Sequence, residues 1–177
     1  MRNAFAILCI MTTLATPRHA AAQIATELHG GVGYTSVSVD AWAGTSAQDW
    51  GQMASGYYVQ VFPYQRGRIS VGGELGYEYF FWYDIFYNGY TSTRNVSATR
   101  VAAVARLGLG GPAYAEAAAS MHLFDGFSDP GIGVGVGYML PINEHFSVPL
   151  GLRGDLVLDP DTQLFASRFN VGIRYSF

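Results

Sequence analysis

Apolar side chains alternate with small or polar side chains along much of this chain. In the stretch "ISVGGELGYEYFFWY", residues 69–83, Ile69 and Val71 share one parity, whereas Glu74 and Glu78 share the other. Successive side chains of a strand point to opposite faces of its sheet, so a period of two predicts a strand with one apolar face. The alternation continues to the last residue in "RFNVGIRYSF". A fold built from such strands has to cover every apolar face.

The same pattern predicts eight strands joined by connections of two kinds. The predicted strands are residues 25–38, 56–63, 69–83, 97–109, 113–123, 131–140, 146–158 and 163–177. Longer loops alternate along the chain with tight turns. The predicted loops are residues 40–55, 84–95, 124–130 and 159–162, and the predicted turns are residues 64–68, 110–112 and 141–145. This arrangement indicates an antiparallel up-and-down meander, with loops at one end and turns at the other.

The composition indicates that these strands cross a membrane. Hydrophobic residues make up 50% of the chain and charged residues 13%, about half the charged fraction of a typical soluble domain. After residue 22, no stretch is long and apolar enough to cross a bilayer as a helix. The sequence therefore predicts an all-β fold, an eight-stranded antiparallel transmembrane β-barrel whose short turns face the periplasm.

The charged residues indicate which face of the strands points outward. The apolar faces carry no charged residue, whereas a soluble periplasmic barrel, the alternative, would expose many. The opposite faces carry five acids and five arginines: Glu27, Glu74, Glu78, Arg100, Arg106, Glu116, Arg153, Asp155, Arg168 and Arg174. An eight-stranded interior is just wide enough to be filled by side chains, and buried charges are tolerable there only in pairs. We therefore expect a salt-bridged, largely closed lumen.

Hairpin symmetry predicts two of the charge pairs. If each hairpin is symmetric about the glycine at its centre, Glu78 lies opposite Arg100, and Arg106 lies opposite Glu116. Both pairs would then join neighbouring strands inside the lumen.

Aromatic residues gather near the strand ends, as in the two interface girdles of membrane barrels. The predicted loop-end girdle is Phe80, Phe81, Trp82, Tyr83 and Phe86, and the predicted turn-end girdle is Phe62, Tyr138, Phe146, Tyr175 and Phe177.

Residues 1–22 have the pattern of a cleavable signal peptide, with an arginine, an apolar run at residues 4–14 and small residues before a cleavage site after Ala22. The apolar run is shorter than the about 20 residues of a spanning helix. The barrel domain then comprises residues 23–177.

The composition of the barrel domain excludes two kinds of chemistry. The one cysteine, Cys9, leaves with the signal, so neither a disulfide nor thiolate chemistry is expected. The barrel domain has no lysine and fewer arginines than acids, which argues against a nucleic-acid partner.

The signal, the eight amphipathic strands, the segment "GIGVGVGYMLPINEHFSVPLGLRGD" and the terminal "RYSF" resemble the OmpA/OmpX-type family of small outer-membrane β-barrels, over roughly residues 25–177. The resemblance implies export through the periplasm to the cell outer membrane of a Gram-negative bacterium. In that family, a final phenylalanine preceded by alternating hydrophobic residues is the signal read by the barrel-assembly machinery. The resemblance therefore implies an assembly signal at Phe169, Ile173, Tyr175 and Phe177.

Few residues of the chain are candidates for a catalytic role. His145 and Ser147 are two apart, as in deacylase-type barrels that modify lipid A, and a serine nucleophile needs such a base. However, they lie at a periplasmic turn, whereas a lipid-A enzyme acts at the outer leaflet. We therefore predict no enzyme activity, no cofactor and no metal. His29 and His122 point inward by parity, and we expect them to be hydrogen-bond partners in the lumen.

The predicted loops are acidic. They carry one arginine, Arg94, against seven aspartates: Asp40, Asp49, Asp84, Asp125, Asp129, Asp159 and Asp161. Divalent cations could bridge these carboxylates to lipopolysaccharide phosphates. We favour the simpler interpretation that Asp suits turns and keeps loops solvated.

These patterns together predict a monomeric structural or surface-interaction protein that presents four extracellular loops on a scaffold embedded in lipid. Its expected partners are outer-membrane lipid and lipopolysaccharide, with the barrel-assembly machinery during biogenesis. The alternatives are a narrow, porin-like channel for small solutes and, less favoured, a lipid-A-modifying barrel enzyme.

Overall fold

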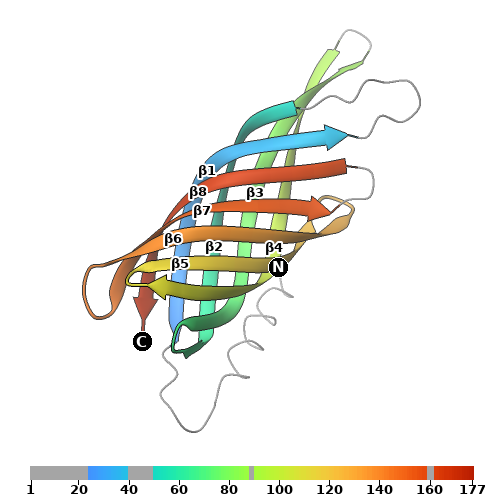
Figure 1. The fold of residues 1–177 in the computed structure, drawn as a ribbon. Coiled ribbons are helices and arrows are strands. Elements are labelled where there is room, and N and C mark those ends of the chain that lie inside the picture. The colour runs from blue at the N-terminus through green and yellow to red at the C-terminus, as the bar shows by residue number, and fades with distance from the viewer. Residues whose placement is uncertain (1–23, 40–49, 88–89, 159–161) are drawn as a thin grey trace.

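The computed structural model describes residues 24–39, 50–87, 90–158 and 162–177 (Figure 1). The predicted signal peptide lies outside these residues. The described residues contain no helix that is long and apolar enough to cross a membrane. They form eight strands: β1 (Ala25–Val39), β2 (Trp50–Arg66), β3 (Ile69–Tyr87), β4 (Tyr90–Gly110), β5 (Ala113–Leu123), β6 (Ser128–Pro141), β7 (Phe146–Leu158) and β8 (Thr162–Ser176).

The strands form a closed antiparallel barrel in chain order, which confirms the predicted fold. Closure joins β8 to β1 in one uninterrupted ladder, from Ala25 opposite Ser176 to Val39 opposite Thr162. In Figure 1 the start of β1 and the end of β8 lie at the same end as the short turns. Closure leaves no strand edge with unpaired backbone groups, a requirement for any sheet surrounded by lipid.

Several strands are longer than predicted. β6 begins at Ser128, so the predicted loop at 124–130 is three residues too long. β2 already begins at Trp50, β3 continues to Tyr87, and β4 starts at Tyr90, so the predicted loop at 84–95 is wrong. In Figure 1 the β3–β4 hairpin reaches beyond the other strands at the loop end. The loop was predicted from the acidic and aromatic character of residues 84–95, but the Thr and Tyr residues of this segment favour strand. A β-bulge lies within β3, between Tyr79 and Phe81.

One of the two predicted pairings is wrong, because the hairpin pairs Tyr87 with Tyr90 instead of being centred on Gly89, and the bulge adds a further shift of one residue. Glu78 lies opposite Ala98, and Arg100 lies opposite Gly76, so that register prediction is wrong by two residues. Arg106 does lie opposite Glu116.

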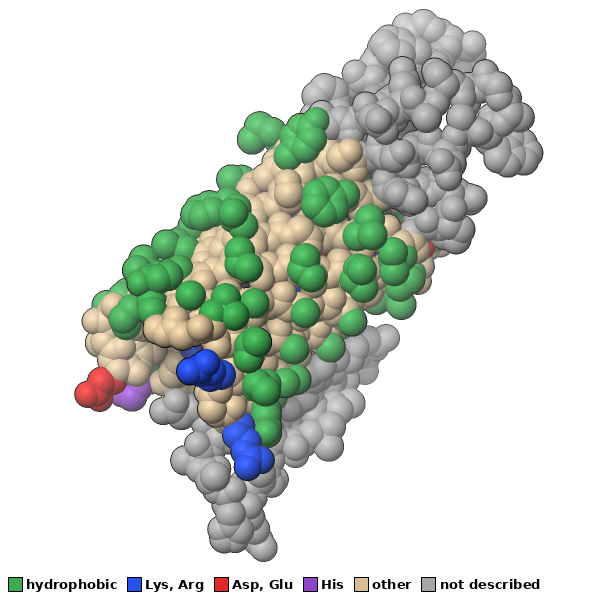
Figure 2. All heavy atoms as spheres, viewed as in Figure 1, with side chains coloured by type: hydrophobic (Ala, Val, Ile, Leu, Met, Phe, Trp, Pro, Cys, Tyr) green, Lys and Arg blue, Asp and Glu red, His purple; other side chains and the backbone are tan. Residues whose placement is uncertain are grey.

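The wall of the barrel is apolar. Large hydrophobic side chains project from its outer face, including Leu28, Tyr57 and Leu152, each about 60% exposed. Among the described side chains, the exposed acids and arginines lie at strand ends, in turns or in a loop: Arg66, Arg68, Asp125 and Glu144. Figure 2 shows hydrophobic side chains spread over the wall and prominent charged ones at the turn end. The barrel is thus apolar outside and charged inside, the reverse of a soluble barrel.

The aromatic girdles need correction. Phe62 and Phe80 are fully buried inside the barrel, because they share parity with inward-facing Gln60 and Glu78. The remaining turn-end residues lie outside or at the rim: Tyr138, Phe146, Tyr175 and Phe177. The side chains of four predicted loop-end residues lie outside the described set: Phe81, Trp82, Tyr83 and Phe86.

Candidate functional site

The ten charged residues singled out in the sequence all lie within the lumen. They come from six strands, β1, β3, β4, β5, β7 and β8, and alternate with outward apolar residues. The side chain of Arg174 is 14% exposed at the turn end, and those of the other nine are at most 8% exposed. Within the described part of the chain, the charged side chains are therefore concentrated in the lumen.

Arg106 organises the turn-end half of the lumen. Its guanidinium lies 2.6 Å from the Glu27 carboxylate and 2.8 Å from that of Glu116. Arg174 contacts the same Glu27 at 3.1 Å. The Tyr114 ring covers the Arg106 guanidinium, with 4.2 Å between its Cζ atom and the ring centroid. An aromatic face attracts a cation, so this stack adds to the ion pairs.

Arg100 and Arg168 organise the half nearer the loops. Arg100 lies 3.0 Å from both Glu74 and Asp155, and 3.4 Å from Glu78. Arg168 donates to Glu78 at 2.7 Å and also contacts Asp155. All five side chains are removed from water.

Arg153 links the two halves. Its guanidinium lies 2.7 Å from Glu74, 3.1 Å from Glu116 and 3.1 Å from Asp155. The ten residues therefore form one connected network, called the lumen network below, in which every acid contacts two or three arginines. Because an unpaired buried charge costs several kcal/mol, this balance is what makes so polar an interior stable.

Two histidines extend the lumen network. Nε2 of His29 lies 2.8 Å from Glu27, and Nε2 of His122 lies 3.1 Å from Glu78. His122 also packs against the Phe80 ring, with 6.0 Å between centroids. Phe80 belongs to an apolar cluster that covers the network on the loop side, formed by Phe80, Ala98, Val157, Leu164 and Ala166.

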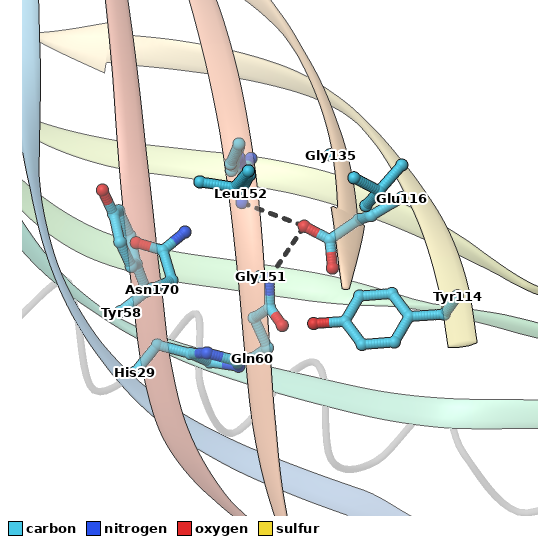
Figure 3. Close-up of a pocket in the computed structure, with 11 residues that line it drawn as sticks. His29, Tyr58, Gln60, Tyr114, Glu116, Gly135, Gly151, Leu152 and Asn170 are labelled. Atoms are coloured by element: carbon cyan, nitrogen blue, oxygen red, sulfur yellow. Dashed lines mark hydrogen bonds and ion pairs between the residues drawn. The ribbon is translucent and has the colours of Figure 1, made fainter. Parts of the chain in front are cut away.

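Little space remains in the lumen. A cavity of about 20 Å³ lies in the turn-end half, which is room for about one water molecule. Figure 3 shows His29, Gln60, Tyr114 and Glu116 around it. Gln60 and Arg153 both donate to the Glu116 carboxylate, at 3.4 and 3.1 Å. This cavity is too small for a solute larger than water.

Glycines on the inner face of β6 make room for these large side chains. A Cβ atom on Gly131 would lie 2.7 Å from the His122 ring. One on Gly133 would overlap the Asp155 carboxylate, and one on Gly137 would overlap the Tyr114 ring. The sequence shows that these glycines share a face, but the side chains that fill their space belong to β5 and β7. Their role is close packing.

The His145 and Ser147 pair does not form a catalytic arrangement. His145 lies in the exposed β6–β7 turn, and its Nδ1 is 3.1 Å from the carbonyl oxygen of Ser176. Ser147 lies opposite Arg174 on β8. No hydrogen bond joins His145 to Ser147 within the described part of the chain. Instead, His145 contacts the backbone of Ser176 at the end of β8.

The residues of the predicted assembly signal line the outer face of β8. The side chains of Phe169, Ile173 and Phe177 are exposed, and Tyr175 packs edge-on against Phe177 with 4.7 Å between ring centroids. Backbone bonds hold this end on both sides. The Phe177 amide donates to Ile24 at 3.0 Å, while the Ser176 amide donates to the His145 carbonyl at 2.9 Å.

The described residues contain no group of three His, Cys, Asp or Glu side chains that could hold a metal ion. Of the predicted acidic loop residues, Asp125 is exposed and Asp129 lies on β6. The other side chains of that set lie outside the described residues: Asp40, Asp49, Asp84, Asp159, Asp161 and Arg94.

No family model matches the chain, and no curated protein sequence matches it. Solved structures do. Neisserial surface protein A aligns with 86% of this chain and 99% of its own, at 11% identity and a TM-score of 0.60. Outer membrane protein AlkL aligns with 92% of this chain and 95% of its own, at 11% identity and a TM-score of 0.56.

The outer membrane protein Ail of Yersinia pestis, solved in a phospholipid bilayer nanodisc, aligns with 89% of this chain and 100% of its own. Its identity is 8% and its TM-score 0.52. At such identities, the likeness concerns the fold. The chain has the fold of the small eight-stranded outer-membrane β-barrels of the OmpA/OmpX type.

Proposed function

We propose that this protein spans the outer membrane of a Gram-negative cell as a closed scaffold that presents its loops at the cell surface, without enzymatic activity. The observation that carries the proposal is the inverted distribution of polarity. Ten ion-paired charges lie inside, and the wall exposes large apolar side chains on all sides of the barrel. A wall of that kind is stable in hydrocarbon and would aggregate in water.

The filled lumen favours the function of a closed scaffold rather than that of a channel. The lumen network and the apolar cluster around Phe80 together occupy the interior along the barrel axis. Solute passage would require several buried ion pairs to separate, each at a cost of several kcal/mol. In planar bilayers we therefore expect a silent barrel. Conductance that rises when Arg100 or Arg106 is neutralised would favour the channel instead.

Electrophoresis tests both the fold class and the location. We expect the protein in the membrane fraction to migrate faster without boiling than after boiling, because a barrel with every strand paired resists SDS until heated. Extraction of the protein without detergent, or an unchanged mobility on boiling, would contradict the proposal.

We also propose that the end of β8 serves as the assembly signal, with the barrel-assembly machinery as the partner. Deleting Phe177 is expected to lower the yield of folded barrel in cells several-fold. Its side chain is 67% exposed, and the deletion removes only the edge-on contact with Tyr175 and one backbone bond to Ile24, so the stability of the molecules that do fold should fall by about 1 kcal/mol or less. Yield is measured from the unboiled band, and stability from urea unfolding of the purified barrel.

Phe165→Ala is the matched control for this deletion. Phe165 is an exposed aromatic residue on the same face of β8, at the loop end. If position matters more than bulk, this control keeps its yield. Equal yields for the deletion and the unmodified chain would contradict the assembly signal.

A further inference from the structure

Two of the arginines whose side chains the structure describes lie outside the lumen network. Arg66 ends β2 and Arg68 lies in the β2–β3 turn, and both are exposed. They are the exposed cationic side chains of the described residues, since Arg174 is mostly covered and paired with Glu27. Neither forms an ion pair with any carboxylate that the structure describes. Their charge is therefore available to a partner.

The turn that carries them is well fixed. Gly67, between the two arginines, has a φ of 60°, which a tight two-residue hairpin turn requires. The carbonyl oxygen of Arg68 accepts a 2.7 Å bond from the amide of Gly108 on β4. Arg66 itself lies opposite Ile69 in the β2–β3 ladder. The two guanidinium groups thus extend from an ordered backbone.

The arginines lie where the apolar wall ends. Tyr64 and Ile69 flank them on the outer face, and Leu107 and Leu109 follow on β4, each about half exposed. Figure 2 shows cationic side chains beside hydrophobic ones near the turn end. An arginine at this level reaches the phosphates of the adjacent leaflet while its stem lies along apolar surface.

This cationic edge is confined to one side of the barrel. The β4–β5 turn, Gly111 and Pro112, has no ionisable side chain, and the β6–β7 turn carries the exposed acid Glu144. An anionic group near the turn end is therefore attracted toward β2–β3 and repelled from β6–β7.

We propose that Arg66 and Arg68 bind the phosphate of an anionic phospholipid in the periplasmic leaflet. The inference rests on the proposed membrane location and adds a lipid site to it. Charge complementarity and continuity with the lipid-facing wall carry it. Guanidinium groups bind phosphate oxygens through paired N–H donors, and the apolar residues beside them contact the acyl chains.

Native mass spectrometry of the purified full-length barrel, titrated with phosphatidylglycerol or phosphatidylcholine, tests the proposal. The unmodified barrel should bind phosphatidylglycerol more tightly. In the double variant Arg66→Gln/Arg68→Gln this preference should fall by about fivefold per arginine, the factor that corresponds to about 1 kcal/mol. Glu144→Gln, at the opposite turn, is the control and should keep the preference.

Three results would overturn the lipid site: equal affinity of the unmodified barrel for both lipids, an unchanged preference in the double variant, or displacement of the lipid by an equal concentration of inorganic phosphate. The last result would indicate a free-anion site. The heat-dependent mobility of each variant is recorded in parallel. Loss of the mobility shift would mean that the variant does not form the membrane barrel, and it would contradict the proposed function rather than the lipid site.

Discussion

Replacing Arg100 by methionine is expected to lower the free energy of unfolding by about 3–5 kcal/mol. The guanidinium lies 3.0 Å from Glu74 and from Asp155, and 3.4 Å from Glu78, with no exposure to solvent. Methionine fills a similar volume without charge, so it leaves the lumen network with five carboxylates and four arginines. Urea unfolding in detergent micelles, followed by the fraction of unboiled fast-migrating barrel, measures the change.

Two further variants separate charge from size. Val101→Met changes the neighbouring residue, which points outward on β4, and should shift stability by about 0.5 kcal/mol or less. Adding Glu74→Gln to Arg100→Met restores equal numbers of acids and arginines and should recover a substantial part of the loss. If Arg100→Met alone were as stable as the unmodified barrel, the carboxylates around Arg100 would have to be solvated, and the lumen would be open.

The general architecture could be predicted from sequence because the signals for it are local. A period of two is visible within one strand, and it predicted strands 113–123 and 146–158 with the bounds that the structure has. The absence of charge from one parity likewise identified the outer face. Both features follow from the alternation of side chains across a sheet and need no knowledge of neighbouring strands.

Most contacts within the lumen could not be predicted in this way, although both predicted pairs are in contact, Arg106 with Glu116 at 2.8 Å and Arg100 with Glu78 at 3.4 Å. Arg106 and Glu27 are 79 positions apart, and Arg168 and Glu78 are 90 apart, because these ion pairs cross the interior between distant strands. Hairpin symmetry applies only to adjacent strands. For the β3–β4 hairpin, a centre displaced from Gly89 and a bulge between Tyr79 and Phe81 together shifted the register by two residues. Which arginine meets which acid depends on barrel closure and on the shift between strands.

Aromatic residues show a similar limit. Phe62 and Phe80 were assigned to the girdles because they stand near strand ends, although their parity places them inside. Parity was the better guide: Phe62 lies over Arg106 with 4.6 Å from its ring centroid to the guanidinium carbon, and Phe80 packs against His122. A rule based on residue type therefore failed where the geometric rule succeeded.

Gly33→Ala is expected to cost about 3 kcal/mol, at the upper end for overpacking, although it adds one methyl group. Gly33 lies opposite Arg168 across the seam that closes the barrel. A Cβ atom there would overlap the carbonyl oxygen of Ser167 and lie 2.6 Å from the Cα of Arg168. Both are main-chain atoms, so no side-chain rotation relieves the clash, and β8 has to move together with the Arg168 guanidinium that binds Glu78.

Gly30→Ala provides a matched control on the same strand and seam. Gly30 points outward, and a Cβ atom on it would meet nothing within 4 Å, so this variant should be neutral or stabilised by up to about 0.5 kcal/mol. Urea midpoints compare the two, and amide exchange should show faster opening of β1 and β8 than of β4 and β5 in Gly33→Ala alone. Equal midpoints would contradict the close approach at the seam, because of these two glycines Gly33 alone lies where a Cβ atom would clash with the β8 backbone.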